Sequence, residues 1–324
     1  MNVLVTGANG FLGHWLVQAL CREGHTVKAM LSTSNKQSSL QELPCKIVHG
    51  DITQIESISS FFPGVDAVFH LAAAISFKKA DNNKLYAVNV DGTRNIVTLC
   101  LSNKIAKLIH LSSVVAIGAS SNSQTLLNEQ SINHLATLNV ASIQSKILGE
   151  KIVLSACQEK GLNATILNPS LIYGAGDAKK AMRHSSVQAA RGKLPFYTDG
   201  GVSIVAVEDV VAAILSAWQK GKSGQRYILS GDNITNQELF FSISKQANAK
   251  PPKTKLPNAL LLSLAHLADF FRIDGMLSIE NVKIATMYHW YDNSKAKREL
   301  DFHPRPALEA IKNSVSWMRE NGYF

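Results

Sequence analysis

Cysteine is scarce in this sequence, and nothing in its spacing suggests a pairing framework or a metal site. The four cysteines (Cys21, Cys45, Cys100 and Cys157) are scattered without a CxxC pair. We therefore expect reduced core residues, no bound metal and a cytoplasmic protein. No apolar run is long enough to span a bilayer, so no membrane insertion is expected. No charged-then-apolar leader precedes the first apolar run, so we expect no signal peptide.

An interleaved basic and aromatic stripe is also missing, although the formal net charge is +9. The lysines and arginines are dispersed, which predicts a solvated basic surface that tolerates anionic ligands rather than a nucleic-acid partner. Hydrophobic residues make up 46% of the 324 positions. That is enough for one large domain or two closely joined ones.

The N-terminal stretch carries the strongest pattern in the chain. Residues 2–6 form a short apolar run typical of a buried strand, and a helical pattern follows from residue 15. Between them stand Gly7, Gly10 and Gly13. Such glycines permit a tight turn, close approach of backbone to a diphosphate, and packing of helix on strand. Glycines after a strand also occur in ordinary turns, but the strand-turn-helix context favours dinucleotide binding.

Short β-rich runs then alternate with helical patterns along the chain. This alternation predicts an α/β fold with a doubly wound parallel sheet of the Rossmann type. We expect residues 1–170 to form the dinucleotide-binding domain and residues 171–324 mainly a smaller substrate lobe, with 203–230 returning to the first domain. The predicted strands are 2–6, 25–31, 46–49, 65–71, 106–111 and 164–168, and the predicted helices include 83–102, 178–191 and 256–271.

The end of the second predicted strand bears on cofactor choice. A carboxylate that binds the ribose of NAD is expected about 20 residues beyond the glycines. Here the chain runs from Ser32 to Lys36 without an acidic residue. Lys36 and the hydroxyls could accept a 2′-phosphate, which favours NADP over NAD. The same loop is also compatible with a plain polar turn.

Several motifs together resemble the extended short-chain dehydrogenase/reductase superfamily, in its NAD(P)-dependent epimerase/dehydratase group. The closest resemblance is to the dihydroflavonol-4-reductase-like and hopanoid-associated sugar-epimerase branch. The motifs are TGANGFLG (6–13), GDI (50–52), HLAA (70–73), NVDGT (89–93), SSVVAIG (112–118), SKILGE (145–150) and NPSLIYGAGD (168–177). The resemblance covers essentially the whole chain. It implies a small-molecule substrate, a homodimer and a reductase, dehydrogenase or epimerase acting on a carbonyl or secondary alcohol.

The glycine turn and this resemblance together give the expected cofactor-binding residues. They are Gly7, Asn9, Gly10, Phe11, Leu12, Gly13, Ser32, Lys36, Asp51, Ile52, Leu71, Ala72, Ala73, Asn89, Ser112, Lys146, Pro169 and Ile172.

One departure from the family pattern decides the function. The family site has a serine or threonine, a tyrosine and a lysine, with the last two four apart on one helix face. Ser113 and Lys146 match, but the tyrosine position holds Ser142, and no tyrosine occurs between Tyr86 and Tyr173. Loss of a positioned general acid typically costs roughly a hundred- to ten-thousand-fold in rate.

Three explanations remain open from the sequence. Tyr173, or a water held by Ser142 and Lys146, could replace the missing phenol. The protein could instead bind cofactor and ligand without turnover, as a sensor or partner-binding subunit. Or the chain could be an inactivated reductase.

The polar residues of the apolar segment 256–271 include His266 and Asp269 rather than cations, so we expect it to pack over the substrate cleft or against a second subunit rather than attach to a membrane. Its apolar character hints at a hydrophobic substrate, and we expect His70 and His110 to be structural histidines.

Overall fold

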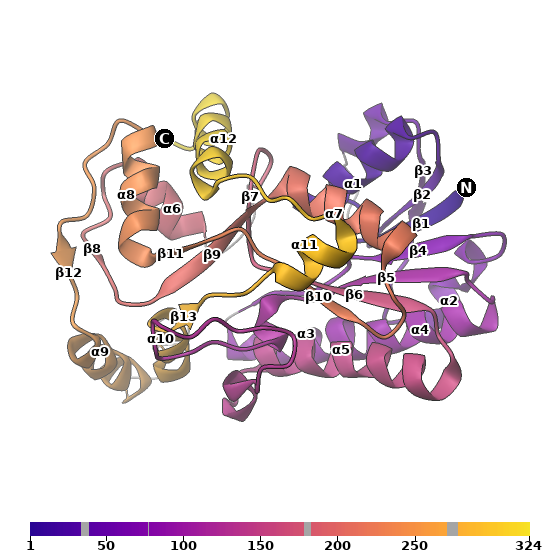
Figure 1. Cartoon of the computed structure of the whole chain (residues 1–324), viewed down its shortest axis with the longest axis horizontal. Helices are drawn as coiled ribbons and strands as arrows, with labels where there is room; N and C mark the ends of the chain where they lie inside the picture. Colours follow the sequence, from indigo (N-terminus) through magenta and orange to yellow (C-terminus); the bar gives the residue numbers. More distant parts are fainter. Residues whose placement is uncertain (34–38, 77, 178–182, 271–277) are drawn as a thin grey trace.

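The computed structural model describes residues 1–33, 39–76, 78–177, 183–270 and 278–324. A large sheet with helices on both faces forms one region, and a smaller region with its own short strands lies beside it (Figure 1). Lys36 lies outside the described residues. Its predicted contact with the cofactor therefore stays a prediction.

The bounds of the elements follow the predicted alternation. The strands are β1 (Asn2–Thr6), β2 (Thr26–Leu31), β3 (Lys46–His49), β4 (Ala67–His70), β5 (Lys107–Leu111), β6 (Ala164–Pro169), β7 (Leu171–Tyr173), β8 (Phe196–Tyr197), β9 (Gly201–Ala206), β10 (Arg226–Leu229), β11 (Asp232–Thr235), β12 (Thr254–Lys255) and β13 (Tyr288–His289). The helices are α1 (Phe11–Arg22), α2 (Ile55–Ile58), α3 (Asn82–Tyr86), α4 (Gly92–Ser102), α5 (Ala141–Lys160), α6 (Arg183–Ala190), α7 (Val207–Lys220), α8 (Asn236–Gln246), α9 (Asn258–Phe270), α10 (Ile279–Ala285), α11 (Ser294–Leu300) and α12 (Ala307–Glu320).

The large sheet is parallel throughout and has the order β10-β6-β5-β4-β1-β2-β3. Alternate residues of β1 enter two different cores. Val3 and Val5 pack in the core that includes residues of α1 and α7, whereas Leu4 packs in the core that includes residues of α4 and α5. A strand buried on both faces needs consecutive apolar residues, which explains the unbroken apolar run at residues 3–5. The predicted doubly wound fold is confirmed.

The strand order reverses between β1 and β4. The chain first moves outward through β2 and β3, then returns to β4 on the other side of β1. In open α/β sheets, ligands bind in the crevice outside the carboxyl ends of the strands at this point. Thr6 pairs with His70 at those ends, so the glycine turn and the segment after β4 are neighbours.

The predicted helix 83–102 is interrupted. Residues Ala87–Asp91 form a π-helical segment between α3 and α4. A fixed period of 3.6 residues could not reveal this interruption. Such segments commonly accompany functional sites, and this one contains Asn89.

The smaller region is organised around β9, which pairs with β11, β13 and β7. Helices α6, α8 and α12 pack on it through a third apolar core. Of the segment 203–230, β9 therefore lies in this second sheet, α7 packs against α1, and β10 is the edge strand of the large sheet. Among the described helices, none is long and apolar enough to cross a bilayer.

Candidate functional site

Only glycine fits at two positions of the turn after β1, because a Cβ there would lie too close to neighbouring backbone atoms. Gly7 has a φ of +69°, and a Cβ there would lie 2.7 Å from the Ala72 nitrogen. A Cβ on Gly13 would lie 2.2 Å from the Gly7 carbonyl oxygen. Helix α1 starts at Gly10 with no side-chain cap and has no acidic residue in its first turn. The arrangement suits a diphosphate group, which would meet bare backbone and the positive end of a helix.

The same turn contacts the segment after β7. The Trp15 indole Nε1 donates a hydrogen bond to the Ala175 carbonyl oxygen (3.0 Å). A Cβ on Gly174 would lie 3.4 Å from the Phe11 ring, so that ring lies against this segment. Residues 171–177 are thereby held beside the first turn of α1. Of the two residues predicted here, Pro169 is buried and Ile172 is 6% exposed.

The carboxyl ends of β2 and β3 supply the other predicted nucleotide contacts. Ser32 is exposed. Asp51 Oδ1 accepts hydrogen bonds from both the nitrogen and the hydroxyl of Thr53 (2.9 and 2.8 Å). Ile52 is 6% exposed, and a Cβ on Gly92 would lie 2.6 Å from its Cδ1. The loop 50–53 is therefore fixed by its own contacts and by α4.

A directed hydrogen-bond chain joins β1 and β4 to the helix beside them. The Ala72 nitrogen donates to Thr6 Oγ1 (3.2 Å), and Thr6 Oγ1 lies 2.7 Å from His70 Nδ1. His70 Nε2 lies 3.2 Å from Thr93 Oγ1, which itself donates to the Asn89 carbonyl oxygen (2.7 Å). This order assigns the proton of His70 to Nε2 and leaves Nδ1 as an acceptor. Burial, followed by the charge of Lys146, lowers the pKa of His70 to about 3.

Asn89, a predicted cofactor contact, has a side chain that is hydrogen-bonded within the protein. Its Nδ2 donates to the Ala74 carbonyl oxygen and to Ser145 Oγ (both 3.0 Å), and its Oδ1 accepts from the Ala74 nitrogen (2.8 Å). A Cβ on Gly149 would lie 2.4 Å from the Asn89 carbonyl oxygen. Asn89 therefore ties the loop after β4 to α5, and Gly149 permits the close approach of that helix.

A second buried network fixes α5 four residues beyond Lys146. Glu150, 3% exposed, accepts hydrogen bonds from Asn168 Nδ2 (2.7 Å) and Arg226 (3.2 Å). Asn168 Nδ2 also donates to the Ser113 carbonyl oxygen (3.0 Å). The residue that bears the predicted serine hydroxyl is thereby held relative to the helix that bears the lysine. Most residues of this network and of the one at Asn89 lie in the family motifs, but the motifs did not reveal that they bond to one another.

Lys146 and Ser113 are both half-buried. Ser113 Oγ accepts from the Val115 nitrogen (3.4 Å) and caps the short turn Val114–Ala116. The charge of Lys146 helps to lower the pKa values of His70 and His110, although burial is the larger cause in both. The lysine therefore lies close to the carboxyl ends of β4 and β5.

Several buried polar atoms at the neighbouring strand ends lack a protein partner within the described residues. They are Ser112 Oγ, Asn168 Oδ1, Ser170 Oγ and Ser230 Oγ. All lie at or just beyond the carboxyl ends of β5, β6 and β10. Together with the glycine turn, these unpaired acceptors and donors fit a polar ligand along this edge of the sheet. The residues present are therefore compatible with a bound dinucleotide.

Ser142 lines a small polar cavity of about 60 Å³ at the start of α5. The other lining side chains come from two distant segments as well as from α5 itself. They are Ser76, Lys79, Asn82, Asn139, Val140, Ala141, Ser278, Glu280 and Asn281. None of these segments carries a recognisable motif, and sequence reasoning did not find the cavity. Ser142, at the position of the family tyrosine, thus lines a cavity together with several polar side chains.

Tyr173, the predicted substitute acid, does not line that cavity. Its side chain is 3% exposed and packs in the core of the smaller region. Its hydroxyl lies 3.0 Å from Ser186 Oγ. The structure brings Ser113, Ser142 and Lys146 to one end of the sheet and gives Tyr173 a different neighbour.

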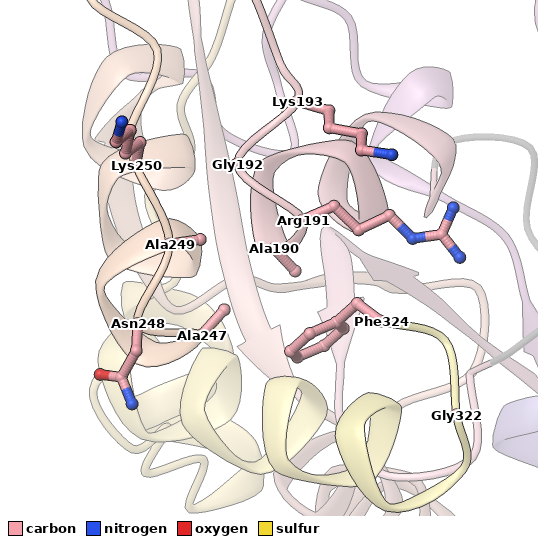
Figure 2. A pocket seen from close by; sticks show the side chains of 10 residues that line it. All are labelled: Ala190, Arg191, Gly192, Lys193, Ala247, Asn248, Ala249, Lys250, Gly322 and Phe324. Atoms are coloured by element: carbon pink, nitrogen blue, oxygen red, sulfur yellow. The ribbon is translucent and has the colours of Figure 1, made fainter.

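A larger open pocket of about 670 Å³ lies elsewhere, between the carboxyl ends of α6 and α8 and the C-terminus. Figure 2 shows Arg191 and Lys193 on one side of it, residues 247–250 on the other, and Phe324 between them. None of the predicted site residues lines this pocket. The candidate active site is therefore the edge of the large sheet and not this hollow.

Known proteins match the chain over almost its whole length. A family model described as NAD dependent epimerase/dehydratase family matches residues 3–230. A Synechocystis protein named dihydroflavonol 4-reductase is 33% identical and aligns over 98% of this chain and 95% of its own. Sterol demethylase protein B of Methylococcus capsulatus is 29% identical over 99% of both.

The solved structures agree with the sequence comparisons. The crystal structure of gox2253 has a TM-score of 0.89 to this chain, with 31% identity and 99% coverage of both chains. The extended short-chain dehydrogenase/reductase fold inferred from the motifs is confirmed.

Proposed function

The chain belongs to the NAD dependent epimerase/dehydratase family, and from this premise we propose that it is an NAD(P)-dependent oxidoreductase of a carbonyl or secondary alcohol. When bound, the nicotinamide ring supplies or accepts the hydride. The protein's own part is to hold the dinucleotide on the glycine turn, to orient the substrate oxygen, and to deliver or remove one proton. Ser113 orients the oxygen, and Lys146 holds the ribose and provides a fixed positive charge.

The observation that carries the proposal is the polar cavity beside Ser142. A water needs on the order of 10–15 Å³ of such space and two or more polar partners. The cavity of about 60 Å³ has that space and several polar side chains in its lining, including Ser142 but not Lys146. Ser142 and Lys146 are one helical turn apart on α5 and face the same way. A water held between them gives its proton to the substrate oxygen during reduction and recovers one from solvent.

We infer a hydrophobic substrate with an oxygen substituent. The names of two relatives refer to a dihydroflavonol and a sterol, which are both multi-ring compounds with oxygen substituents. For the cofactor, the exposed Ser32 and the absence of an acidic residue from 32 to 36 support NADP.

Three variants of the full-length protein test the proton route. Ser142→Tyr restores the family phenol, Tyr173→Phe removes the other candidate acid, and Lys146→Ala removes the charge. Turnover is measured with NADPH against a panel of hydrophobic ketones, and dinucleotide binding is measured separately by fluorescence. We expect slow turnover in the parent protein, loss of it in Lys146→Ala, and little change in Tyr173→Phe.

The outcomes separate the explanations. A rise of roughly a hundredfold in Ser142→Tyr marks a reductase that lacks its acid, and an unchanged or lower rate marks a site adapted to water. Loss of turnover in Tyr173→Phe with the fold intact would show that Tyr173 is the acid. Dinucleotide binding without turnover by the parent on any substrate would favour a non-catalytic sensor, which the missing tyrosine also allows.

A further inference from the structure

Helix α9 presents a row of leucines to the outside of the smaller region. Leu260, Leu264 and Leu267 are 49%, 45% and 54% exposed, and their spacing puts them on one helix face. The opposite face, with Leu261 and Ala265, packs on Val282 of α10. Helix α9 therefore has two apolar faces and only one partner among the described residues.

The chain that leads into α9 is basic. Between Leu239 and Leu267 the sequence contains four lysines and no aspartate or glutamate. Lys250, Lys253 and Lys255 of this stretch are exposed. Lys255 forms an ion pair with Asp199 (2.7 Å), while its side chain stays 53% exposed. The leucine row is thus flanked by positive charge.

Figure 1 shows that these parts follow one outer edge of the molecule, from α8 through β12 to α9. Two exposed aromatic side chains lie on this edge or on the strand paired with it. Phe196 of β8, which pairs with Thr254 of β12, and Phe241 of α8 are each 37% exposed. Apolar and cationic groups therefore alternate along the edge formed by residues 241–267, which we call the lobe edge.

We propose that the lobe edge docks on an anionic lipid surface. A peripheral contact of this kind needs an amphipathic helix whose apolar side chains enter the interface and lysines that face the headgroups. Here the exposed leucines lie on α9, which has no lysine or arginine and contains Asp269, and the lysines lie in the segment that leads into it. Neither requires a spanning helix. The charge also argues against a second copy of the chain on this edge, because two such edges would bring eight lysines together. The inference goes beyond the proposed function and does not depend on turnover.

Vesicle flotation of the purified full-length protein tests this docking. The vesicles are phosphatidylcholine alone, or phosphatidylcholine with roughly one-third phosphatidylglycerol. We expect flotation with the anionic vesicles only. Replacing Leu260, Leu264 and Leu267 by serine should lower the bound fraction about tenfold. The double change Lys250→Gln and Lys253→Gln should lower it by roughly tenfold or more.

A matched control uses exposed apolar residues elsewhere. Leu126, Ile132 and Leu308 are 57%, 77% and 52% exposed, and their replacement by serine should leave flotation unchanged. An equal loss in this control, or no flotation of the parent protein, overturns the proposal. So does light scattering that shows a dimer which the three-leucine variant converts to monomer, because a second copy then covers the row. Circular dichroism verifies that each variant is folded.

Discussion

The glycine turn and the Ser142 cavity are both elements of the candidate site, but they are built in opposite ways. The turn is one continuous stretch, and its shape follows from backbone clearances around Gly7 and Gly13. The cavity is assembled from three segments centred near residues 79, 140 and 280. Local chemistry therefore determines where a dinucleotide is held. Only the folded chain determines what surrounds the reacting oxygen.

Gly13→Ala should have the largest effect, because it tests the backbone clearance directly. Its Cβ would lie 2.2 Å from the Gly7 carbonyl oxygen and 2.8 Å from that of Ala8, so the turn must shift. We expect NADPH binding, measured by fluorescence titration, to weaken about a hundredfold.

The control for this change is Gly64→Ala. Gly64 also has a positive φ of +74°, but its Cβ would meet nothing within 4 Å. That variant should bind NADPH as the parent does, at a small cost in stability. A Gly13→Ala protein with unchanged affinity would mean that the turn does not hold the dinucleotide.

Glu150→Leu tests the buried hydrogen-bond network that fixes α5, the helix that carries Ser142 and Lys146. The change leaves Arg226 without its carboxylate and Asn168 with one acceptor fewer. Because the Arg226 side chain is 26% exposed and can be hydrated, we expect a loss of about 2–3 kcal/mol in the free energy of unfolding, measured in urea.

Glu159→Leu is the matched control, since Glu159 lies on the same helix and is exposed. Its unfolding free energy should change by less than about 0.5 kcal/mol. Equal losses in the two variants would show that the buried network does not stabilise α5.

His110→Leu should have the smallest effect of these changes, and the effect on Tm should be visible only at acidic pH. Burial, then His70 and Lys146, lowers the pKa of His110 well below its usual value. The folded protein therefore keeps this ring neutral, while the unfolded chain protonates it below pH ~6.5. The contribution of the neutral His110 ring to the free energy of unfolding is therefore fully present above that pH and is lost as the pH falls.

The size of this decline follows from linkage. Each such histidine contributes about 1.4 kcal/mol per pH unit, or about 2 °C in Tm for a chain of this length. His110→Leu should flatten the fall in Tm between about pH 6 and pH 4 by that amount. The exposed His134→Leu should leave the slope unchanged. A slope in His110→Leu equal to that of the parent would contradict the assignment.

The sequence was sufficient for those parts of the molecule whose structure is determined by neighbours in the chain. The bounds of β1 and β3 agree with the prediction residue by residue, and in β1 the reason is that a strand buried on both faces leaves a continuous apolar run. Gly7, Gly10 and Gly13 were identified from their spacing and from their place between a predicted strand and a predicted helix. These features need no knowledge of the rest of the fold.

Contacts between distant segments could not be predicted. Asn89 looked like a cofactor ligand because it lies in a family motif, yet its side chain holds Ala74 and Ser145. Tyr173 looked like a replacement acid because it was the next tyrosine, yet its hydroxyl lies against Ser186. In both cases no sequence pattern indicates which residue, distant in the chain or beyond the next loop, the side chain will contact.

The π-helical segment Ala87–Asp91 has a consequence for how the chain tolerates length changes. A π-turn contains one residue more than an α-turn, so the segment is equivalent to a single-residue insertion within an ordinary helix. Deleting one residue there would turn the segment into a regular α-turn and leave α3 and α4 nearly in phase. The change would fall on the segment that contains Asn89, whose side chain bonds Ala74 and Ser145. A shortening that the helix can absorb would thus alter the link between the loop after β4 and the helix that carries Lys146.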